Sequence, residues 1–374
     1  MLYLTFNDAP SGIFYSQVTD TCTFIRNELD EEVDLLSFIS ARGFFRERKK
    51  IKTAFPGARV IPMFPGVANW KKNSLALSLF LRMKRPRVVI ARGPFATNLV
   101  LALKPKVWNG RLCFDARGAY HSEFNEYDVS GSDSLRRTIG EVEKNAVMKA
   151  DIRLSVSGAL VNYWIENYNY VPGSEVVIPC TLGNDFEKGF SRTEAVTGRR
   201  KLGFADHETV LAYSGSAAGW QSLQGSAAFI SALMEKNAGL RLLVLTPGEL
   251  PAVLEPFRAR IICKWVNAPQ VRELLLACDY GLLLRERSVT NKVSSPVKFA
   301  EYLSCGLKVL MTNAIEDSSA FVNAHNAGSI LDLSGPVPLL EKPPQEEKER
   351  MSELAAKYFR KRSFTKNYKL ILHA

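Results

Sequence analysis

The sequence lacks the motifs that would assign it to several common classes. Its six cysteines have no CxxC spacing, which in a chain of this length indicates reduced thiols rather than a disulfide framework. The four histidines are too scattered for a zinc site, so we expect no metal held by the protein alone. RNP, zinc-finger and KH-like motifs are absent, and we therefore expect no nucleic-acid partner.

The sequence also lacks a recognisable secretion signal or membrane span. Residues Met1–Asp8 have no basic n-region, so we expect no signal peptide. The longest uncharged stretch, Thr209–Met234, is rich in Gly, Ala and Ser and contains two glutamines, which is a poor composition for crossing a bilayer. These absences predict a cytoplasmic protein.

The composition is that of an ordinary globular protein, with 46% hydrophobic and 23% charged residues, and excludes a disordered or collagenous chain. A length of 374 residues predicts two or three domains. Lysine and arginine number 49 against 38 acidic residues, a formal charge of +11. This excess favours a negatively charged partner, which is a nucleic acid, an anionic membrane or a phosphorylated substrate.

Apolar runs alternate with helical patterns in both halves of the chain, which predicts βαβ units and buried parallel sheets. The expected strands are Leu2–Phe6, Val33–Ile39, Arg59–Met63, Val88–Ala91, Leu112–Asp115, Ile152–Val156, Val210–Ser214, Arg241–Leu245, Ala259–Cys263, Tyr280–Leu284, Lys308–Met311 and Ser329–Leu331. The expected helices are Gln17–Leu29, Gly43–Ala54, Ser74–Arg85, Ala96–Leu103, Ser134–Lys149, Ser222–Lys236, Pro269–Cys278, Pro296–Cys305 and Ser318–Asn326.

The charged, Gly-rich stretch Leu182–Arg200 reads as a linker between the two halves. We therefore predict an α/β fold of two tandem doubly wound, Rossmann-like domains, residues 1–182 and 183–354, that face each other across a cleft. A helical tail, residues 355–374, is expected to pack back on the first domain. Ligands of such sheets bind outside the carboxyl ends of the strands.

The segment Arg285–Gly306 carries the strongest local signal. A strand ends near Leu284, Ser295 is a suitable N-cap, and Pro296 suits the first helical position. Lys298 and Glu301 then lie three residues apart on one face of the helix. The helix start and nearby polar side chains suit a diphosphate, with Glu301 placed to accept sugar hydroxyls. The residues expected at this anion are Arg285, Arg287, Lys292, Ser294, Ser295 and Lys298. The alternative is a solvated helix with an i,i+3 ion pair.

Residues 295–310, Ser-Pro-Val-Lys-Phe-Ala-Glu-Tyr-Leu-Ser-Cys-Gly-Leu-Lys-Val-Leu, resemble the nucleotide-sugar-binding segment of bacterial family-4-type glycosyltransferases of the GT-B fold. Segments 114–118, 177–185, 211–216 and 266–281 also resemble that family, so the resemblance covers nearly the whole chain. It implies that Lys298 contacts the donor diphosphate and that Glu301 binds the ribose. It further implies base contacts at Trp265 and Val266, and a phosphate-facing loop that ends in Ser11 and Gly12. An ordinary β–α turn is the alternative for that loop.

Three positions depart from the family pattern. Val293 replaces a glutamate near the transferred sugar, Lys308 replaces a proline, and the loop Ser216–Gln221 lacks the usual Arg and Lys. The departures leave the fold assignment unchanged but bear on the identity of the donor and, to a lesser extent, on activity.

The resemblance implies a retaining, metal-independent glycosyltransferase without a cofactor. It would move a sugar from a nucleotide-sugar donor to a glycan or lipid-linked acceptor in bacterial surface polysaccharide or glycolipid synthesis. Residues near the end of a first-domain strand, in the loop Asp115–Glu126, are expected to act on acceptor or sugar, and Asp115 to face the cleft. These residues are Asp115, Arg117, His121 and Glu123. The alternatives are a nucleotide-sugar epimerase or hydrolase of the same fold, and a degenerate binding or scaffold protein.

Two first-domain segments mix basic and apolar residues, Arg42–Lys52 and Lys71–Arg87. This mixture is typical of a peripheral contact with an anionic membrane at the inner face of the cytoplasmic membrane. The alternative is a solvated helix face whose apolar side packs on the sheet.

Overall fold

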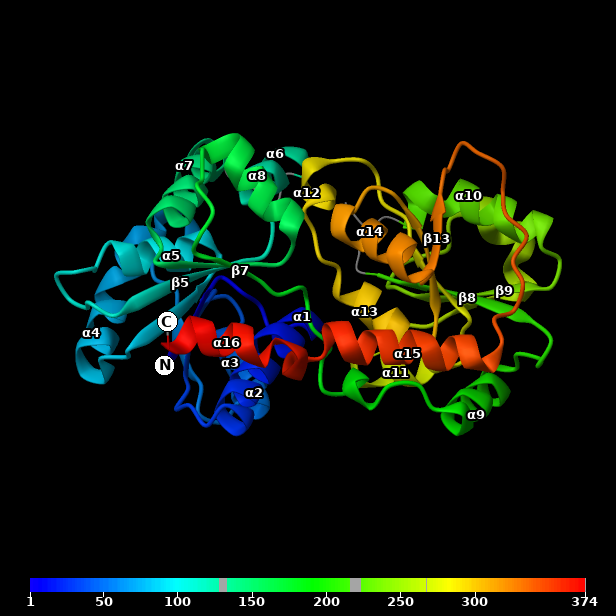
Figure 1. Cartoon of the computed structure of the whole chain (residues 1–374), viewed down its shortest axis with the longest axis horizontal. Coiled ribbons are helices and arrows are strands. Elements are labelled where there is room, and N and C mark those ends of the chain that lie inside the picture. The colour runs from blue at the N-terminus through cyan, green and yellow to red at the C-terminus, as the bar shows by residue number, and fades with distance from the viewer. Residues whose placement is uncertain (128–132, 216–222, 267, 374) are drawn as a thin grey trace. The chain divides into compact units, whose positions relative to one another are not determined.

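The structure, a computed structural model, describes residues 1–127, 133–215, 223–266 and 268–373 (Figure 1). It divides into two compact units. Unit 1 comprises Met1–Gly183, Val293–Ser295 and Lys361–Ala374, and unit 2 comprises Asn184–Lys292 and Pro296–Arg360. The loop Ser216–Gln221, which departs from the family pattern, and Asn267 lie outside the described residues.

Unit 1 is built on a seven-stranded parallel sheet of order β3-β2-β1-β4-β5-β6-β7. Its strands are β1 (Leu2–Phe6), β2 (Asp34–Ile39), β3 (Arg59–Pro62), β4 (Val88–Arg92), β5 (Arg111–Ala116), β6 (Ile152–Ser155) and β7 (Glu175–Val177). The order reverses between β1 and β4, which pair through Thr5 and Arg92 at their carboxyl ends. This reversal is the topological switch point at which doubly wound sheets bind ligands.

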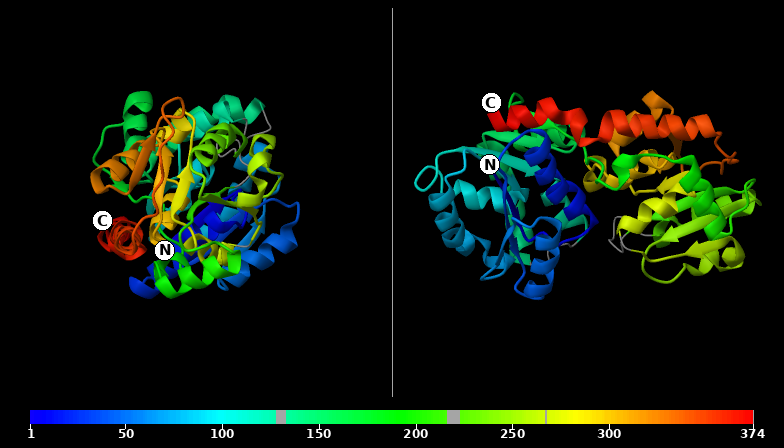
Figure 2. Two further views of the ribbon diagram at one scale, coloured as in Figure 1. Left: turned by 90° about the vertical axis from the view of Figure 1, so that its right-hand side faces the viewer. Right: turned by 90° about the horizontal axis from the view of Figure 1, so that it is seen from below.

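Helices cover both faces of the first sheet (Figure 2). They are α1 (Gly12–Phe14), the π-helix η1 (Tyr15–Thr19), α2 (Asp20–Glu28), α3 (Phe44–Ala54), η2 (Val67–Asn73), α4 (Ser74–Lys84), α5 (Gly93–Leu101), α6 (Tyr120–Glu126), α7 (Asp133–Lys149), α8 (Gly158–Tyr168), η6 (Lys361–Phe364) and α16 (Thr365–His373). Tyr368 and Ile371 of α16 are buried in the same core as Phe14, Val18 and Ile25.

Unit 2 is built on a six-stranded parallel sheet of order β10-β9-β8-β11-β12-β13, whose switch point lies between β8 and β11. Its strands are β8 (Thr209–Ser214), β9 (Leu240–Leu245), β10 (Ile261–Cys263), β11 (Tyr280–Leu283), β12 (Lys308–Thr312) and β13 (Gly328–Leu331). Its helices are η3 (Phe186–Lys188), α9 (Arg192–Leu202), α10 (Leu223–Lys236), η5 (Ala252–Arg260), α11 (Ala268–Leu276), α12 (Val289–Lys292), α13 (Val297–Ser304), α14 (Glu316–His325) and α15 (Gln345–Phe359).

The predicted fold class, two doubly wound parallel sheets, is confirmed. Strands that helices cover on both faces read as uninterrupted apolar runs, so their positions follow directly from composition. All five residues of β1, for example, are buried.

The linker predicted at Leu182–Arg200 is wrong in its second half, which forms α9. Ser191 caps this helix by accepting the Glu194 backbone N–H, and Gly203 ends it at φ 71°. The buried positions of α9 are Ala195, Gly198 and Leu202, which form a small apolar stripe, and Arg199, whose charged side chain is buried beside them.

Two further predictions about helix boundaries are wrong. The loop expected at Asp115–Glu126 contains α6, and α13 begins at Val297 with Pro296 as its N-cap residue rather than Ser295. The Ser295 hydroxyl accepts the backbone N–H of Cys180 at 3.0 Å instead. A hydroxyl engaged by a distant backbone group is not available to cap the helix.

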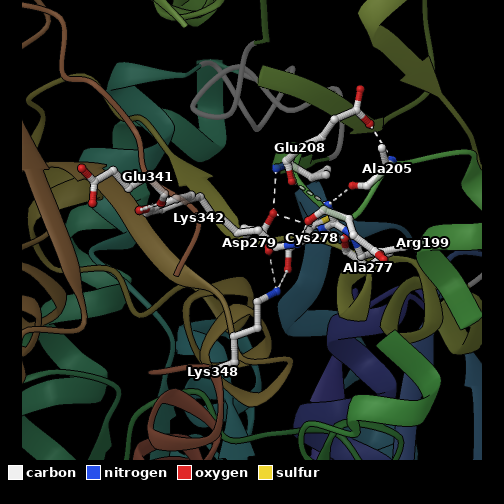
Figure 3. Close-up of polar contacts among 12 residues, drawn as sticks. Arg199, Ala205, Glu208, Ala277, Cys278, Asp279, Glu341, Lys342 and Lys348 are labelled. Atoms are coloured by element: carbon white, nitrogen blue, oxygen red, sulfur yellow. Dashed lines mark hydrogen bonds and ion pairs between the residues drawn. The ribbon is translucent and has the colours of Figure 1, made fainter. Parts of the chain in front are cut away.

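A buried ion-pair cluster at the amino end of β11 holds several elements of unit 2 together (Figure 3). Asp279 is fully buried and accepts Arg199 Nη1 of α9 at 3.1 Å and Lys348 Nζ of α15 at 2.6 Å. Its Oδ2 also accepts the backbone N–H of Val210 at 2.8 Å. The cluster lies at the edge of the sheet opposite the carboxyl ends, and it fixes α9 and α15 against the strands.

Candidate functional site

The carboxyl ends of β8 and β11, which flank the switch point of unit 2, carry a compact polar group. We call it the α13 cluster; it consists of Ser214, Arg285, Lys298, Glu301 and Tyr302. Lys298 lies in the first turn of α13, and its ammonium donates to the backbone carbonyl of Ser214 at the end of β8. The half-buried ammonium therefore lies where a helix N-terminus meets a strand end, as an anion site requires.

The environment of Lys298 and Glu301 shifts both groups toward neutrality. Burial lowers the pKa of Lys298 to about 7, and the Arg285 guanidinium lowers it further while Glu301 opposes the shift. Burial raises the pKa of Glu301 to about 7, against the effect of Lys298. Strongly shifted groups at a switch point are typical of ligand sites, since an incoming charge restores the ionised form.

Tyr302 fixes the strand end that Lys298 touches. Its buried hydroxyl accepts the backbone N–H of Ser214 at 3.0 Å and lies 3.4 Å from the carbonyl of Leu282. Its ring lies against Gly281, where a Cβ would come within 2.3 Å of ring carbon Cδ2. Any side chain at Gly281 would displace the ring, so the two residues together set the position of the β8 end.

The three cations predicted in the loop after β11 occupy different surroundings. Arg285 is buried, and its backbone exchanges hydrogen bonds with the Thr312 hydroxyl, at 3.0 Å from the N–H and 2.7 Å to the carbonyl. Arg287 and Lys292 are exposed and line a hollow of about 440 Å³ beside α14. Lys292 Nζ lies 3.4 Å from a carboxylate oxygen of Glu316 in this hollow. Of these three cations, Arg285 is the one that lowers the pKa of Lys298.

The remaining residues predicted for donor binding lie in separate segments. Ser294 and Ser295 are half-buried and belong to unit 1. Trp265 follows β10 and is 68% exposed, and Val266 beside it is half-buried. An exposed indole on a loop is available for stacking against a flat ligand.

The predicted phosphate-facing loop lies at the start of α1 in unit 1. Ser11 and Gly12 are exposed, and the Ser11 hydroxyl accepts the backbone N–H of Phe14 at 3.2 Å. The π-helix η1 follows directly, a distortion that is frequent near functional sites.

The switch point of unit 1 carries a buried network that we call the Asp115 cluster; it consists of Tyr3, Asp8, Arg92, Asp115 and Arg117. The Tyr3 hydroxyl donates to Asp115 Oδ2 at 2.5 Å, and Arg117 Nε lies 2.8 Å from Asp115 Oδ1. Arg92 joins the two carboxylates, at 3.5 Å from Asp115 and 3.3 Å from Asp8. Burial and the Asp115 charge raise the pKa of Tyr3 well above its usual range, so the phenol stays a donor.

Asp115, which the sequence predicts to face the cleft, has a fully buried side chain, and both its oxygens are engaged within unit 1. It is a positioning residue for Arg92 and Arg117. Its place inside the strand, with Ala116 after it, turns its side chain into the core. Arg92 is the last residue of the neighbouring strand β4 and lies opposite Asp115 in the sheet. Opposite charges near the ends of two predicted strands could have indicated this pairing from the sequence.

The other two first-domain candidates lie on α6. His121 is exposed, while Glu123 is half-buried and burial raises its pKa to about 7. Glu143 of α7, which sequence reasoning missed, accepts the backbone N–H groups of Tyr120 and His121 at 3.1 and 2.8 Å. It lies among the buried positions of α7, which include Ile139 and Val147. A carboxylate at four-residue spacing from these apolar residues predicts a buried hydrogen-bonding role. Glu143 therefore caps the helix that carries both candidates.

No protein-family model matches this sequence, and no curated protein matches it. The fold of the whole chain is similar to that of Anabaena HepE in complex with UDP, with a TM-score of 0.72 and 12% identity over 98% of both chains. It is also similar to sucrose-phosphate synthase from Thermosynechococcus elongatus, with a TM-score of 0.66 and 12% identity over 98% of this chain and 96% of that one. A putative UDP-N-acetylglucosamine 2-epimerase from Listeria monocytogenes has a TM-score of 0.54 and 12% identity, over 100% of this chain and 91% of that one. These likenesses establish a fold shared with GT-B proteins of different activities.

Proposed function

We propose that this protein is a glycosyltransferase that uses a nucleotide-sugar donor. The observation that carries the proposal is the α13 cluster, which holds Lys298 at a helix N-terminus and at the switch point of a parallel sheet. The fold shared with a protein that binds UDP supports the same choice of ligand.

In the proposed reaction the leaving group is a nucleoside diphosphate, whose negative charge grows as the glycosidic bond breaks. Lys298 and the α13 N-terminus would stabilise that charge more strongly in the transition state than in the ground state, which accelerates the step. Glu301 would accept ribose hydroxyls. The further donor contacts that we propose are Ser11, Gly12, Trp265, Val266, Arg285, Arg287, Lys292, Ser294 and Ser295.

Arg117, His121 and Glu123 are proposed to act on the acceptor or the transferred sugar, with Asp115 holding Arg117 in place. A carboxylic acid whose pKa lies near 7, as that of Glu123 does, can exchange a proton with a hydroxyl group at neutral pH. The acceptor is proposed to be a glycan or a lipid-linked sugar. We further propose retention of configuration, independence from metal and cofactor, membership of family 4, and a role in bacterial surface polysaccharide or glycolipid synthesis.

The proposed place of action is the cytoplasm, at the inner face of the membrane, with contact through Arg42–Lys52 and Lys71–Arg87. Among the described residues, no helix combines the length and the apolar character needed to span a bilayer.

A thermal-shift screen of UDP-, GDP-, ADP- and dTDP-sugars tests donor binding, because a ligand specific for the native state raises the melting temperature. We expect one nucleotide to give a clear shift, and its sugar to be transferred only when an acceptor is present. Absence of a shift with every nucleotide sugar would overturn the proposal.

An epimerase is the second candidate, supported by the fold shared with a putative 2-epimerase. Turnover of the donor without any acceptor would favour an epimerase or hydrolase. Donor binding without turnover would favour a binding or scaffold protein.

A further inference from the structure

The excess of positive charge in this protein arises in one segment of unit 1. Residues 48–114 contain fifteen lysines and arginines and no aspartate or glutamate, while the rest of the chain holds 34 basic and 38 acidic residues. The formal charge of +11 therefore arises entirely within this segment. Such segregation creates a local field toward an anionic partner.

Within this segment α4 is apolar on two sides. Leu77, Phe80 and Leu81 are buried beneath the helix. On its outer side Leu75, Leu79 and Met83, at spacings of four residues, are 72%, 63% and 66% exposed. Large aliphatic side chains repeated along an exposed helix face usually mark an interaction surface.

Phe64 lies beside the start of α4, where Asn73 holds its backbone. The Asn73 amide oxygen accepts the backbone N–H of Phe64 at 2.9 Å, and its NH₂ group donates to the carbonyl of Pro65 at 3.0 Å. The Phe64 ring is 85% exposed next to the start of α4. Exposed cations surround these side chains, namely Lys71, Lys72, Arg82, Lys84 and Arg85.

We propose that this surface, Phe64 with the outer face of α4, docks on an anionic phospholipid membrane. Phe64, Leu75, Leu79 and Met83 would enter the boundary between headgroups and acyl chains, and the surrounding cations would contact lipid phosphates. Figure 1 shows α4 at the periphery of unit 1, where a planar surface can reach it. This docking does not rest on the proposed transferase activity.

Charge selects the membrane over the other occupants of such a face. A second copy would bring together two basic surfaces whose acidic neighbour, Asp34, already pairs with Lys84, and this repulsion costs affinity. A nucleic acid would satisfy the cations but would leave the three aliphatic side chains and Phe64 without an apolar partner. An anionic bilayer satisfies both kinds of group.

The exposed apolar side chains distinguish the two segments, Arg42–Lys52 and Lys71–Arg87, that the sequence predicts as membrane contacts. In α3, Phe45 is the one exposed large apolar side chain among the described residues of Arg42–Lys52. Glu47 there lies 2.6 Å from Arg46 Nε and 3.3 Å from Lys50 Nζ, which offsets part of the charge. At the end of α4, Lys84 Nζ lies 3.2 Å from a carboxylate oxygen of Asp34, but α4 exposes three large apolar side chains, so it is the primary contact.

Flotation with vesicles of phosphatidylcholine alone, or with phosphatidylglycerol added, tests the proposal. We expect binding only to the anionic vesicles and weakening at high salt. Leu75→Ser with Leu79→Ser should weaken binding about tenfold or more, and Lys71→Gln with Lys72→Gln by about fivefold per charge. Leu339→Ser, which removes a side chain 71% exposed in unit 2, is the matched control and should leave binding unchanged.

Failure to bind anionic vesicles would overturn the proposal, as would equal binding by the serine variant and the control. Concentration-dependent dimerisation that the serine variant abolishes would assign the face to a second copy. Binding to DNA or RNA that the serine variant leaves intact, without vesicle binding, would assign the cations to a nucleic acid. Because all variants lie on exposed positions, an unchanged melting temperature confirms that they fold.

Discussion

The two sheets carry charged groups at the same topological position and use them differently. In unit 1 the charges at the switch point are paired with each other, and Asp115 at their centre is fully buried. In unit 2, Lys298 and Glu301 are half-buried, and their pKa values are both shifted to about 7. The charges at one switch point thus neutralise each other, while the other switch point holds a lysine whose positive charge an anionic ligand can restore.

The difference follows from where the charged residues lie on their elements. Asp115 and Arg92 belong to strands, and the side chains at these strand ends turn into the unit. Lys298 and Glu301 lie on a helix that begins after the strand, so their side chains reach the sheet edge from outside it. A site for an anion therefore depends more on the helix than on the strand beside it.

The largest expected effect is the loss of stability on Asp115→Asn. Removing the charge leaves the buried Arg92 with Asp8 alone and leaves Arg117 without the carboxylate that its Nε contacts, which should cost about 3–5 kcal/mol of the free energy of unfolding. Urea denaturation measures this loss. Glu28→Gln, which breaks an exposed ion pair with Arg362, is the control and should cost under about 1 kcal/mol. Equal losses in the two variants would contradict the view that the Asp115 cluster is structural.

The second effect concerns the α13 cluster, where Lys298→Ala should lower transfer by roughly tenfold or more because one charge facing the leaving diphosphate is lost. The variant should remain folded, with a small loss of stability because the Ser214 carbonyl loses its donor. Lys201→Ala removes a lysine from an exposed pair with Glu273 and controls for the loss of a cation. Full activity in a folded Lys298 variant would remove this residue from the site.

A third, smaller effect is expected for Tyr302→Phe. The change leaves the Ser214 backbone N–H without its acceptor, at a cost of about 1–3 kcal/mol, and loosens the strand end that Lys298 touches. We expect weaker binding of the nucleotide sugar with a smaller change in kcat. Tyr280→Phe, whose hydroxyl donates to Glu341 at the other end of the sheet, is the matched control. An unchanged KM would exclude a positioning role for Tyr302.

The smallest effect is a dependence of donor affinity on pH. As pH rises from 6 to 8, Lys298 loses its proton and Glu301 becomes charged, so the site loses positive character. Affinity for UDP-glucose, whose diphosphate does not titrate in this range, should fall roughly threefold to tenfold. Calorimetry at several pH values measures the slope. A slope that persists unchanged in the Lys298→Ala variant would mean that other groups control it.

Much of the second sheet and its site could be predicted from the sequence. Lys298 and Glu301 lie on one helix after a strand, and that arrangement depends only on local spacing. The sequence also contained Ser191 and Glu194 at a helix start, yet the charge of α9 concealed its narrow apolar stripe. The partner of Ser295 could not be predicted, because Cys180 lies 115 residues away in the chain.

The sequence by itself determined the two doubly wound sheets and the helix that carries Lys298, because buried parallel strands and helix starts depend on short-range sequence patterns. Only the tertiary structure decided which charged residues are buried and paired. Asp115 is fully buried among paired charges, whereas Lys298 is half-buried beside Arg285 and Glu301, and neither environment can be predicted from the neighbouring residues in the sequence. It likewise decided that the aliphatic residues of α4 divide into a buried and an exposed face.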